Sequence, residues 1–343
     1  VTVGAMFQAW EQFPSIHELR LELPASETAN SLPDFLDEMK WEMEWVLAMQ
    51  ASDGSVYHKL STTKFGGFIM PETEKEKRYF TSWGSAATAD FVAMTAMASR
   101  IFEPYDPAFS QRCRDAALQS YSFLVAHPDD HRPDLQSFST GEYQTRDSDD
   151  RLWAAAEMWQ TFGETQYLQD FENRARNQNP PIDTNWDWGN VKNLGMFTYL
   201  LSSREGKNPD LSKKLQDALL RNADDMVKTG REHGYGRPLG TLYYWGCNGT
   251  VARQCMNLMV ANRLSPNPDY VNTALAALDH LFGRNYYCRS FVTGLGLNPP
   301  LNPHDRRSGG DTIREPWPGY LIGGGHTGTN WKDEQEDYRT NEI

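Results

Sequence analysis

Hydrophobic residues recur at helical spacing along most of the chain. Between residues 35 and 47 the apolar positions fall three or four residues apart, as on one face of a helix. They are Phe35, Leu36, Met39, Met43, Val46 and Leu47. Similar patterns predict helices at about 86–101, 107–126, 149–162, 189–203, 210–229, 248–263 and 268–282. No convincing strand-like alternation accompanies these patterns. The sequence therefore predicts an all-α fold.

The connections between these predicted helices alternate between short and long. Gly163, Gly230 and Gly283 follow three predicted helices and are expected to end them. The long connections, at 50–80, 128–148 and 180–189, carry aromatic and charged residues. This alternation suits a closed toroid of helical hairpins whose long loops share one functional face. No fixed-period repeat or linker rich in Pro, Ser or Thr interrupts the chain, so we expect one domain over residues 1–343.

Composition and charge exclude several classes of partner. The 39% of hydrophobic residues can build a core, and the mean hydropathy of -0.66 leaves a polar surface. The formal net charge of -13 disfavours binding to nucleic acid and to anionic membranes. No apolar run approaches the ~20 residues that a membrane span needs. We therefore expect neither a nucleic-acid partner nor a membrane segment.

The helical rhythm stops at Tyr286, and a segment rich in Gly and Pro runs to Ile343. Compact domains rarely keep so long a loop without a function. It gathers polar residues that can take part in catalysis, together with aromatic residues that can stack on sugar rings. These are His304, Arg306, Asp333, Asp337 and Glu342, with Trp317, Tyr320, Trp331 and Tyr338. This mixture is typical of a reaction on a sugar that is driven by carboxylates.

Two motifs in this segment resemble the signatures of glycoside hydrolase family 9. Residues 290–300 read SFVTGLGLNPP and residues 303–306 read PHDR, similar to the histidine signature of that family. Trp331-x-Asp333-x4-Tyr338-x3-Glu342 resembles its acidic signature. Residues 140–143, 149–157 and 244–246 also resemble the family, so the likeness covers essentially the whole chain. In detail it is closest to the cellulosomal branch of cellobiohydrolases and endoglucanases.

The resemblance implies an (α/α)6 barrel that hydrolyses β-1,4-glucans with inversion. It assigns the general acid to Glu342 and places His304 and Asp333 with it in the catalytic group. Arg306 and His304 would donate hydrogen bonds to sugar hydroxyls, and Asp337 would join the substrate-binding residues. An isolated acidic run such as 333–337 is otherwise usually a solvated surface. Glu342 needs a raised pKa, through burial or nearby negative charge, to stay protonated near neutral pH.

Aromatic residues supply the predicted sugar-stacking surfaces. Sugar rings have apolar faces, so exposed aromatic rings bind them through dispersion contacts. The predicted stacking residues are Trp245, Trp186, Tyr338 and Trp317. Trp41, Trp45 and Trp159 lie within predicted helices and are expected in the core, whereas Trp153 is left open between the two roles.

A structural calcium site is a further expectation. Calcium takes several oxygen ligands, and the stretch 147–150 offers Ser148, Asp149 and Asp150, with Asp187 on a neighbouring loop. The resemblance implies calcium at the matching place. Helix N-capping by these same residues is the alternative.

The sequence departs from the family at one catalytic position. The family's base is an aspartate in an Asp-Ala-Gly-Asp motif, and this motif is not found in residues 1–343. Residues 1–6 resemble the helix that comes shortly after that motif in the family, and Glu342 is followed only by Ile343. We therefore expect an (α/α)6 barrel that is incomplete at its N- and C-termini, and a 343-residue chain that alone is inactive or nearly so.

The functional prediction is a secreted cellulase that acts on cellulose or cello-oligosaccharides. Cellobiohydrolase or endoglucanase specificity stays open, as does activity on xyloglucan or chitooligosaccharides. A helical toroid that binds glucan without cutting it is the second hypothesis, and a polysaccharide lyase the third. Accessory carbohydrate-binding, immunoglobulin-like or dockerin modules are expected in the full-length protein.

Overall fold

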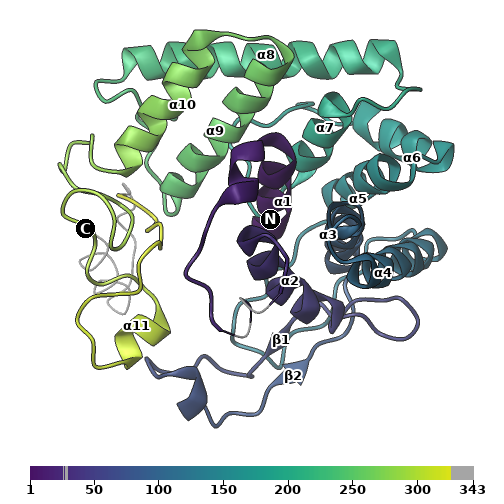
Figure 1. Ribbon diagram of the computed structural model, residues 1–343, viewed down its shortest axis with the longest axis horizontal. Helices are drawn as coiled ribbons and strands as arrows, with labels where there is room; N and C mark the ends of the chain where they lie inside the picture. Colours follow the sequence, from purple (N-terminus) through teal and green to yellow (C-terminus); the bar gives the residue numbers. More distant parts are fainter. Residues whose placement is uncertain (26, 28–29, 326–343) are drawn as a thin grey trace. The chain divides into compact units, whose positions relative to one another are not determined.

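The computed structural model describes residues 1–25, 27 and 30–325, which form two compact units. Unit 1 comprises residues 1–63, 78–181 and 188–212, and unit 2 comprises residues 64–77, 182–187 and the described chain from Lys213 onward. The regular secondary structure of both units is almost entirely helical (Figure 1). None of the described helices is long and apolar enough to cross a membrane.

At the centre of unit 1 lies α3 (Ser85–Phe102), a helix that is rich in small residues. The helices of this unit are α1 (Thr2–Gln12), α2 (Asp34–Leu47), α3, α4 (Pro107–Ala126), α5 (Ser148–Phe162), α6 (Thr165–Arg176) and α7 (Lys192–Leu201). A short 3-10 helix, η1 (Pro14–Glu18), follows α1. Helix α3 packs against α4 and α5 (Figure 1). Ala89, Ala93 and Ala96 are fully buried there, and their small side chains allow the helices to approach closely.

Helix α5 also packs against α7 within unit 1. Trp153 and Trp159 of α5 are buried, which settles Trp153 as a core residue. A Cβ atom added to Gly4 of α1 would stand 2.5 Å from Cζ2 of Trp153, so only glycine fits at that contact. The only sheet in the described chain is the two-residue pair of β1 (Leu60–Ser61) and β2 (Tyr79–Phe80), which are antiparallel. The sequence-based expectation of an all-α fold therefore holds for the described residues.

Unit 2 contains α9 (Cys247–Leu264) and α10 (Pro268–Leu281), which pack against each other (Figure 1). Helix α8 (Pro209–Glu232) begins in unit 1 and continues into unit 2. The short helices η2 (Pro71–Thr73) and α11 (Arg306–Gly310) complete the helical elements of unit 2 in the described chain. Helix α11 interrupts the segment that the hydrophobic pattern left without helices.

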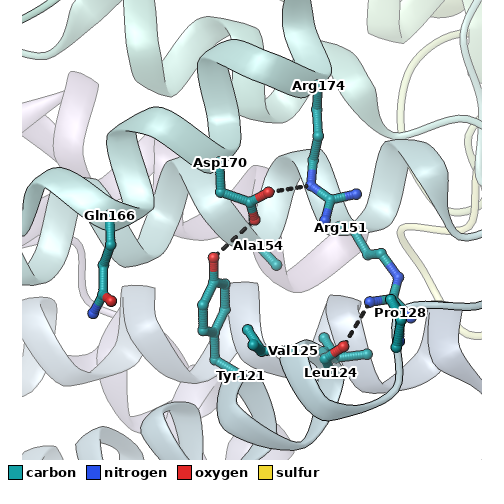
Figure 2. A pocket seen from close by; sticks show the side chains of 9 residues that line it. All are labelled: Tyr121, Leu124, Val125, Pro128, Arg151, Ala154, Gln166, Asp170 and Arg174. Atoms are coloured by element: carbon teal, nitrogen blue, oxygen red, sulfur yellow. Dashed lines mark hydrogen bonds and ion pairs between the residues drawn. The ribbon is translucent and has the colours of Figure 1, made fainter.

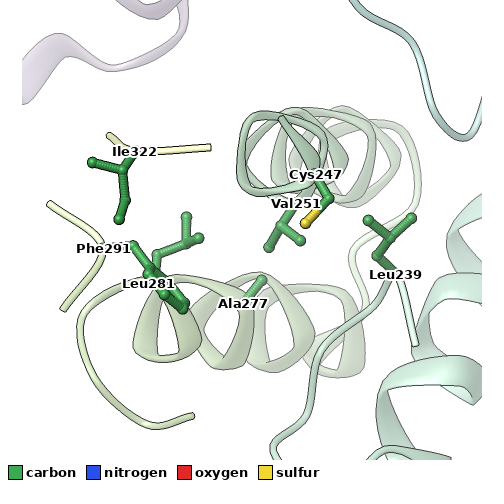
Figure 3. Packing of buried hydrophobic residues seen from close by; sticks show 7 residues of the cluster. All are labelled: Leu239, Cys247, Val251, Ala277, Leu281, Phe291 and Ile322. Carbon is green, nitrogen blue, oxygen red and sulfur yellow. The ribbon is translucent and has the colours of Figure 1, made fainter. Parts of the chain in front are cut away.

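A hydrophobic cluster fixes the beginning of the Gly/Pro-rich segment to α9 and α10. Figure 3 shows Leu239, Cys247, Val251, Ala277, Leu281, Phe291 and Ile322 in this cluster. The backbone N–H of Phe291 donates to the carbonyl oxygen of Leu281 (2.8 Å), and the N–H of Ile322 donates to that of Phe291 (2.9 Å). The residues around Phe291 and around Ile322 therefore pack together against α9 and α10.

Helix ends agree with the sequence at two of the three glycines. Gly163 follows α5 with φ +80, and Gly283 lies two residues beyond α10 with φ +132. These left-handed angles are available to glycine without steric cost. Gly230, in contrast, lies inside α8, so the predicted end of that helix is wrong by about one turn.

Candidate functional site

The buried residue Thr293 links the two ends of the segment 293–320, which contains His304. The hydroxyl of Thr293 donates to the carbonyl oxygen of Trp317 (2.6 Å) and accepts from the N–H of Tyr320 (2.9 Å). Its own N–H donates to the carbonyl oxygen of Tyr320 (3.0 Å), and its carbonyl accepts from Gly319 (2.8 Å). These four bonds join Thr293 to residues 317–320. Residues 304–306 lie between these two positions in the sequence. Thr293 is fully buried, so the Thr293 side of these bonds is shielded from water.

Asp305 sets the local geometry between His304 and Arg306. It is the N-cap of α11, and one carboxylate oxygen accepts from the N–H and the hydroxyl of Ser308, both at 2.9 Å. Its other oxygen pairs with Arg307 at 3.2 Å. Burial raises the pKa of Asp305, but these hydrogen bonds and the Arg307 charge outweigh it, and the pKa lies below its usual value. The ionised cap fixes the backbone from which both neighbouring side chains project.

His304 and Arg306 both lie against the segment 64–77 of unit 2. The Nε of Arg306 donates to the carbonyl oxygen of Gly66 (3.1 Å), and its guanidinium carbon lies 4.8 Å from the ring centroid of Phe65. The imidazole of His304 meets the ring of Phe68 edge to face, with centroids 5.5 Å apart. The structure thus places two of the predicted site residues against one distant segment of the chain.

The pKa of His304 lies below its ordinary value. Partial burial is the larger cause and the positive charge of Arg306 the second, while Asp305 acts in the opposite direction. The neutral imidazole is therefore favoured near neutral pH. A neutral imidazole can donate one hydrogen bond and accept another, as a sugar hydroxyl also can. Arg306 keeps its charge and acts only as a donor.

Two of the predicted stacking residues have exposed rings. The indole of Trp317 is 42% exposed, with the Arg307 guanidinium 4.7 Å from its ring centroid. Trp245, two residues before α9, is 53% exposed. The hydroxyl of its neighbour Tyr244 donates to Oγ1 of Thr250 (2.8 Å), which anchors this turn to the helix. Both indoles can contact a ligand.

Trp186 corrects one prediction, because its indole is only 1% exposed. Its Nε1 donates to Oδ1 of Asn257 (2.9 Å), and its carbonyl oxygen accepts from Nε of Arg253 (2.6 Å). A ring enclosed in this way offers no face to a sugar. The predicted stacking role of Trp186 is therefore replaced by a structural one within unit 2.

Of the three tryptophans that were expected in the core, one is buried and two are exposed. Trp159 is buried as expected, but Trp41 and Trp45 of α2 are 64% and 49% exposed. Their spacing places both on one face of the helix. Met39 and Met43 occupy the buried positions instead. The core placement of Trp41 and Trp45 was therefore wrong.

The predicted calcium ligands differ in their burial. Asp149 and Asp150 are buried in the first turn of α5, whereas Ser148 and Asp187 are exposed. One oxygen of Asp149 accepts from the N–H of Val191 (2.7 Å), and Oδ2 of Asp150 is buried without a hydrogen bond. Among the described residues, no group of three or more His, Cys, Asp or Glu side chains is arranged to hold a metal.

Burial dominates the electrostatics of this pair of carboxylates. It raises the pKa of Asp149 to about 6, and it raises the pKa of Asp150 well above its ordinary value, with Asp90 adding to both shifts. The N-cap residue of α5 is Asp147, and its side chain makes no cap hydrogen bond. Its carboxylate instead accepts from Nε of Arg151 (2.6 Å). Two buried carboxylates fit a cation, but the described side chains alone do not complete its shell.

Four predicted site residues, Glu342, Asp333, Asp337 and Tyr338, lie outside the described residues. The predicted general acid is among them. Phe65 and Phe68, which no sequence motif marks as site residues, contact Arg306 and His304. The sequence signal for this contact was the Phe-Gly-Gly-Phe pattern at 65–68 within a long aromatic connection. The local sequence does not indicate that this pattern contacts residues about 240 positions later.

A cavity of about 330 Å³ lies elsewhere, within unit 1, and contains none of the predicted site residues (Figure 2). Asp170 joins two of its polar groups, accepting from the hydroxyl of Tyr121 (2.8 Å) and from Nε of Arg174 (2.8 Å). Arg151 is also satisfied, by Asp147 and by the carbonyl oxygen of Leu124 (3.0 Å). These contacts are consistent with a structural network between α4, α5 and α6.

Comparisons with known proteins place these features in one family. The family model described as Glycosyl hydrolase family 9 matches residues 1–343. Endoglucanase D of Acetivibrio thermocellus is 61% identical over 348 residues, which cover 100% of this chain and 55% of that protein. The xyloglucan-specific endo-beta-1,4-glucanase BoGH9A of Bacteroides ovatus is 32% identical over 376 residues, covering 100% of this chain and 63% of that protein. The chain thus spans 55% of the length of the first of these relatives and 63% of the second.

A solved structure agrees with this placement. The single mutant of a thermostable endoglucanase from Alicyclobacillus acidocaldarius matches with a TM-score of 0.87 and 30% identity. The match covers 95% of this chain and 62% of that one. The expected fold class, a partial (α/α)6 barrel, is thereby confirmed. The chain belongs to glycosyl hydrolase family 9.

Proposed function

We propose that the complete protein carrying this chain hydrolyses internal β-1,4-glucosidic bonds of cellulose with inversion. The observation that carries the proposal is the pairing of His304 and Arg306 on either side of the Asp305 cap, both held against residues 65–68. Family membership and the relative named Endoglucanase D support the same reaction class.

In the proposed mechanism, Glu342 donates its proton to the leaving glycosidic oxygen. An aspartate outside residues 1–343 removes a proton from the attacking water on the opposite face of the sugar. An inverting pair of carboxyl groups stands roughly 6.5–9.5 Å apart, which leaves room for that water. Asp333 and Asp337 add negative charge that would raise the pKa of Glu342. His304 and Arg306 donate hydrogen bonds to hydroxyls beside the cleaved bond, and Trp245 and Trp317 stack on sugar rings.

The Glu342→Gln variant of the full-length protein tests the mechanism. It should lose about 10²–10⁴-fold in kcat on phosphoric-acid-swollen cellulose, the range expected for a lost proton donor. Cello-oligosaccharide binding, measured by calorimetry, should be retained. Glu315→Gln is a matched control at an exposed glutamate and should behave as wild type. A wild-type protein that binds glucan but releases no sugar would instead establish the non-catalytic alternative.

Endoglucanase action is favoured over cellobiohydrolase action by the name of the 61% identical relative. The two differ on soluble carboxymethyl cellulose, where internal cuts lower viscosity long before many reducing ends appear. Xyloglucan belongs in the same comparison because BoGH9A is named for that substrate. Predominant release of cellobiose with little loss of viscosity would favour the cellobiohydrolase alternative.

Three further features belong to this proposal. An insoluble polymer is met outside the cell, which supports a secreted protein. The relatives are longer than the matched region, which leaves room for carbohydrate-binding, immunoglobulin-like or dockerin modules. A structural calcium ion is proposed at Asp149 and Asp150, supported by the buried Oδ2 of Asp150 that makes no hydrogen bond in the described chain.

A further inference from the structure

We propose that Phe65 and Phe68 are positioning residues that hold Arg306 and His304 in their glucan-binding orientation. The inference rests on the proposed function and names further residues of the same site. Neither phenylalanine belongs to the two signatures in the Gly/Pro-rich segment. Both lie in residues 64–77, which belong to unit 2 although the chain on either side of them belongs to unit 1.

Phe65 and the backbone beside it fix the inner part of the Arg306 side chain. The ring of Phe65 lies under the guanidinium, with 4.8 Å between its centroid and Cζ, within the range of cation–π attraction. The Gly66 carbonyl accepts from Nε at 3.1 Å. Nη1 and Nη2 have no hydrogen-bond partner within the described part of the chain. Phe65 and the Gly66 carbonyl therefore orient the guanidinium of Arg306, and its two terminal nitrogens remain available to a ligand.

Phe68 holds the imidazole of His304 and the helix that follows it. The two rings meet edge to face at 88°, which limits rotation of the imidazole. Helix α11 also approaches this segment directly. A Cβ atom added to Gly309 would overlap the ring of Phe68, and one added to Gly310 would stand 2.7 Å from the backbone carbonyl carbon of Ile69. The two glycines permit a close contact that fixes α11 relative to Phe68.

The exposure of the two phenylalanines argues against a purely structural role. Phe65 is 55% exposed and Phe68 is 50% exposed, so each leaves about half of a large apolar ring in water. Burial alone gains little from rings placed in this way. Phe65 also contacts Arg306, and Phe68 also contacts His304, the two side chains that we propose bind the substrate. Rigid support of this kind matters because small errors in the placement of binding groups reduce catalysis strongly.

Leucine and tyrosine substitutions separate the two roles. Phe65→Leu and Phe68→Leu keep an apolar side chain but remove the ring, whereas Phe65→Tyr and Phe68→Tyr keep the ring. In the full-length protein, we expect each leucine variant to lower kcat/KM on cello-oligosaccharides about 10- to 100-fold. The tyrosine variants should stay close to wild type. Leu275→Ala, at a 54% exposed position on α10, is the control and should be neutral.

A second readout distinguishes positioning from a general loss of structure. Phe68→Leu should raise the pKa of His304, measured by NMR titration, toward the ordinary value of about 6.5 because the imidazole becomes more hydrated. Asp305 and Arg306, the charged neighbours that influence this pKa, are unchanged in that variant. If a leucine variant does not unfold cooperatively, Phe65→Met or Phe68→Met replaces it as a more flexible ring-free variant.

The outcomes separate this inference from the proposed function. A wild-type protein that hydrolyses glucan, with leucine variants as active as Leu275→Ala, overturns the positioning role alone. An equal loss in the leucine and tyrosine variants also overturns it, because the ring would then not be the feature that matters. A full-length wild-type protein that neither binds nor hydrolyses glucan overturns both proposals.

Discussion

The indole Nε1 of Trp186 donates a hydrogen bond to Oδ1 of Asn257 over 2.9 Å, and both side chains are almost fully buried. Nδ2 of the same asparagine donates to the carbonyl oxygen of Asp183 (2.9 Å) and to Oδ1 of Asn222 (2.8 Å). Asn257 therefore ties the loop before Trp186 to α8 and α9. This arrangement makes Trp186 part of the framework of unit 2.

Replacing Trp186 by Phe should reduce stability without changing glucan affinity. The substitution leaves Oδ1 of Asn257 buried without its donor, which costs about 1–3 kcal/mol in the free energy of unfolding. Urea denaturation measures this change, and calorimetry with cellohexaose measures binding. Weaker binding in a variant of unchanged stability would restore the stacking role that the structure argues against.

Replacing Trp245 by Ala should weaken glucan binding and leave stability almost unchanged. The indole is 53% exposed, so its removal changes the free energy of unfolding little. The loss of an aromatic stacking surface should weaken cello-oligosaccharide binding by about 1 kcal/mol, roughly fivefold in Kd. Trp45→Ala is the matched control, since Trp45 is 49% exposed on α2 and has no assigned role. Equal affinities in the two variants would remove Trp245 from the site.

The contrast between Trp186 and Trp245 shows how far sequence reasoning reaches. Both precede predicted helices after long connections, so local pattern gave them the same role. Their burial depends on partners distant in sequence, such as Asn257, which is 71 positions from Trp186. Trp41 and Trp45 were misplaced for a related reason, because a large apolar side chain within a helix does not itself indicate which face is covered.

Helices and motifs were more accessible to prediction than their long-range support. Hydrophobic periodicity located α3, α4, α9 and α10 to within one or two residues, because one face of each is buried. Helix α6 was missed, since its apolar residues are few among many polar ones. The motifs identified His304 and Arg306, but the contact with residues 65–68 arises only from folding.

A buried histidine in unit 2 should make stability sensitive to mild acid. His280 is 4% exposed, and burial, followed by the charges of Arg237, His233 and Arg284, lowers its pKa to about 4. Its unfolded value is about 6.5, so between pH 6.5 and 4 the unfolded state binds a proton that the folded state does not. Stability from this group is present above pH 6.5 and is lost as the pH falls.

The expected loss between pH 7 and pH 5 is about 2 kcal/mol from His280 alone. Urea denaturation at the two pH values gives the wild-type difference, which also contains other groups. The His280→Leu variant should show a difference smaller by about that amount, whatever its stability at pH 7. Identical pH differences in the variant and the wild type would show that His280 is protonated equally in both states.

Calcium should stabilise the protein through Asp149 and Asp150. A cation offsets the cost of burying two adjacent carboxylates, and its stabilising effect is about 2.7 kcal/mol when its concentration is a hundred times Kd. Removal of calcium with EDTA should therefore lower the Tm of wild type, and Asp150→Asn should abolish most of this response. Because burial raises the pKa of Asp149 to about 6, the calcium effect should also be weaker at pH 5 than at pH 7.

The exposed Asp115 supplies the matched control for that experiment, since Asp115→Asn removes the same charge from the surface of α4. Its response to EDTA should equal that of wild type. A wild-type Tm that is indifferent to EDTA and to added calcium would exclude the site. An equal EDTA response in Asp150→Asn and Asp115→Asn would place the ion on other ligands. Either result would identify helix-dipole stabilisation of α5 as the remaining role for its two acidic residues.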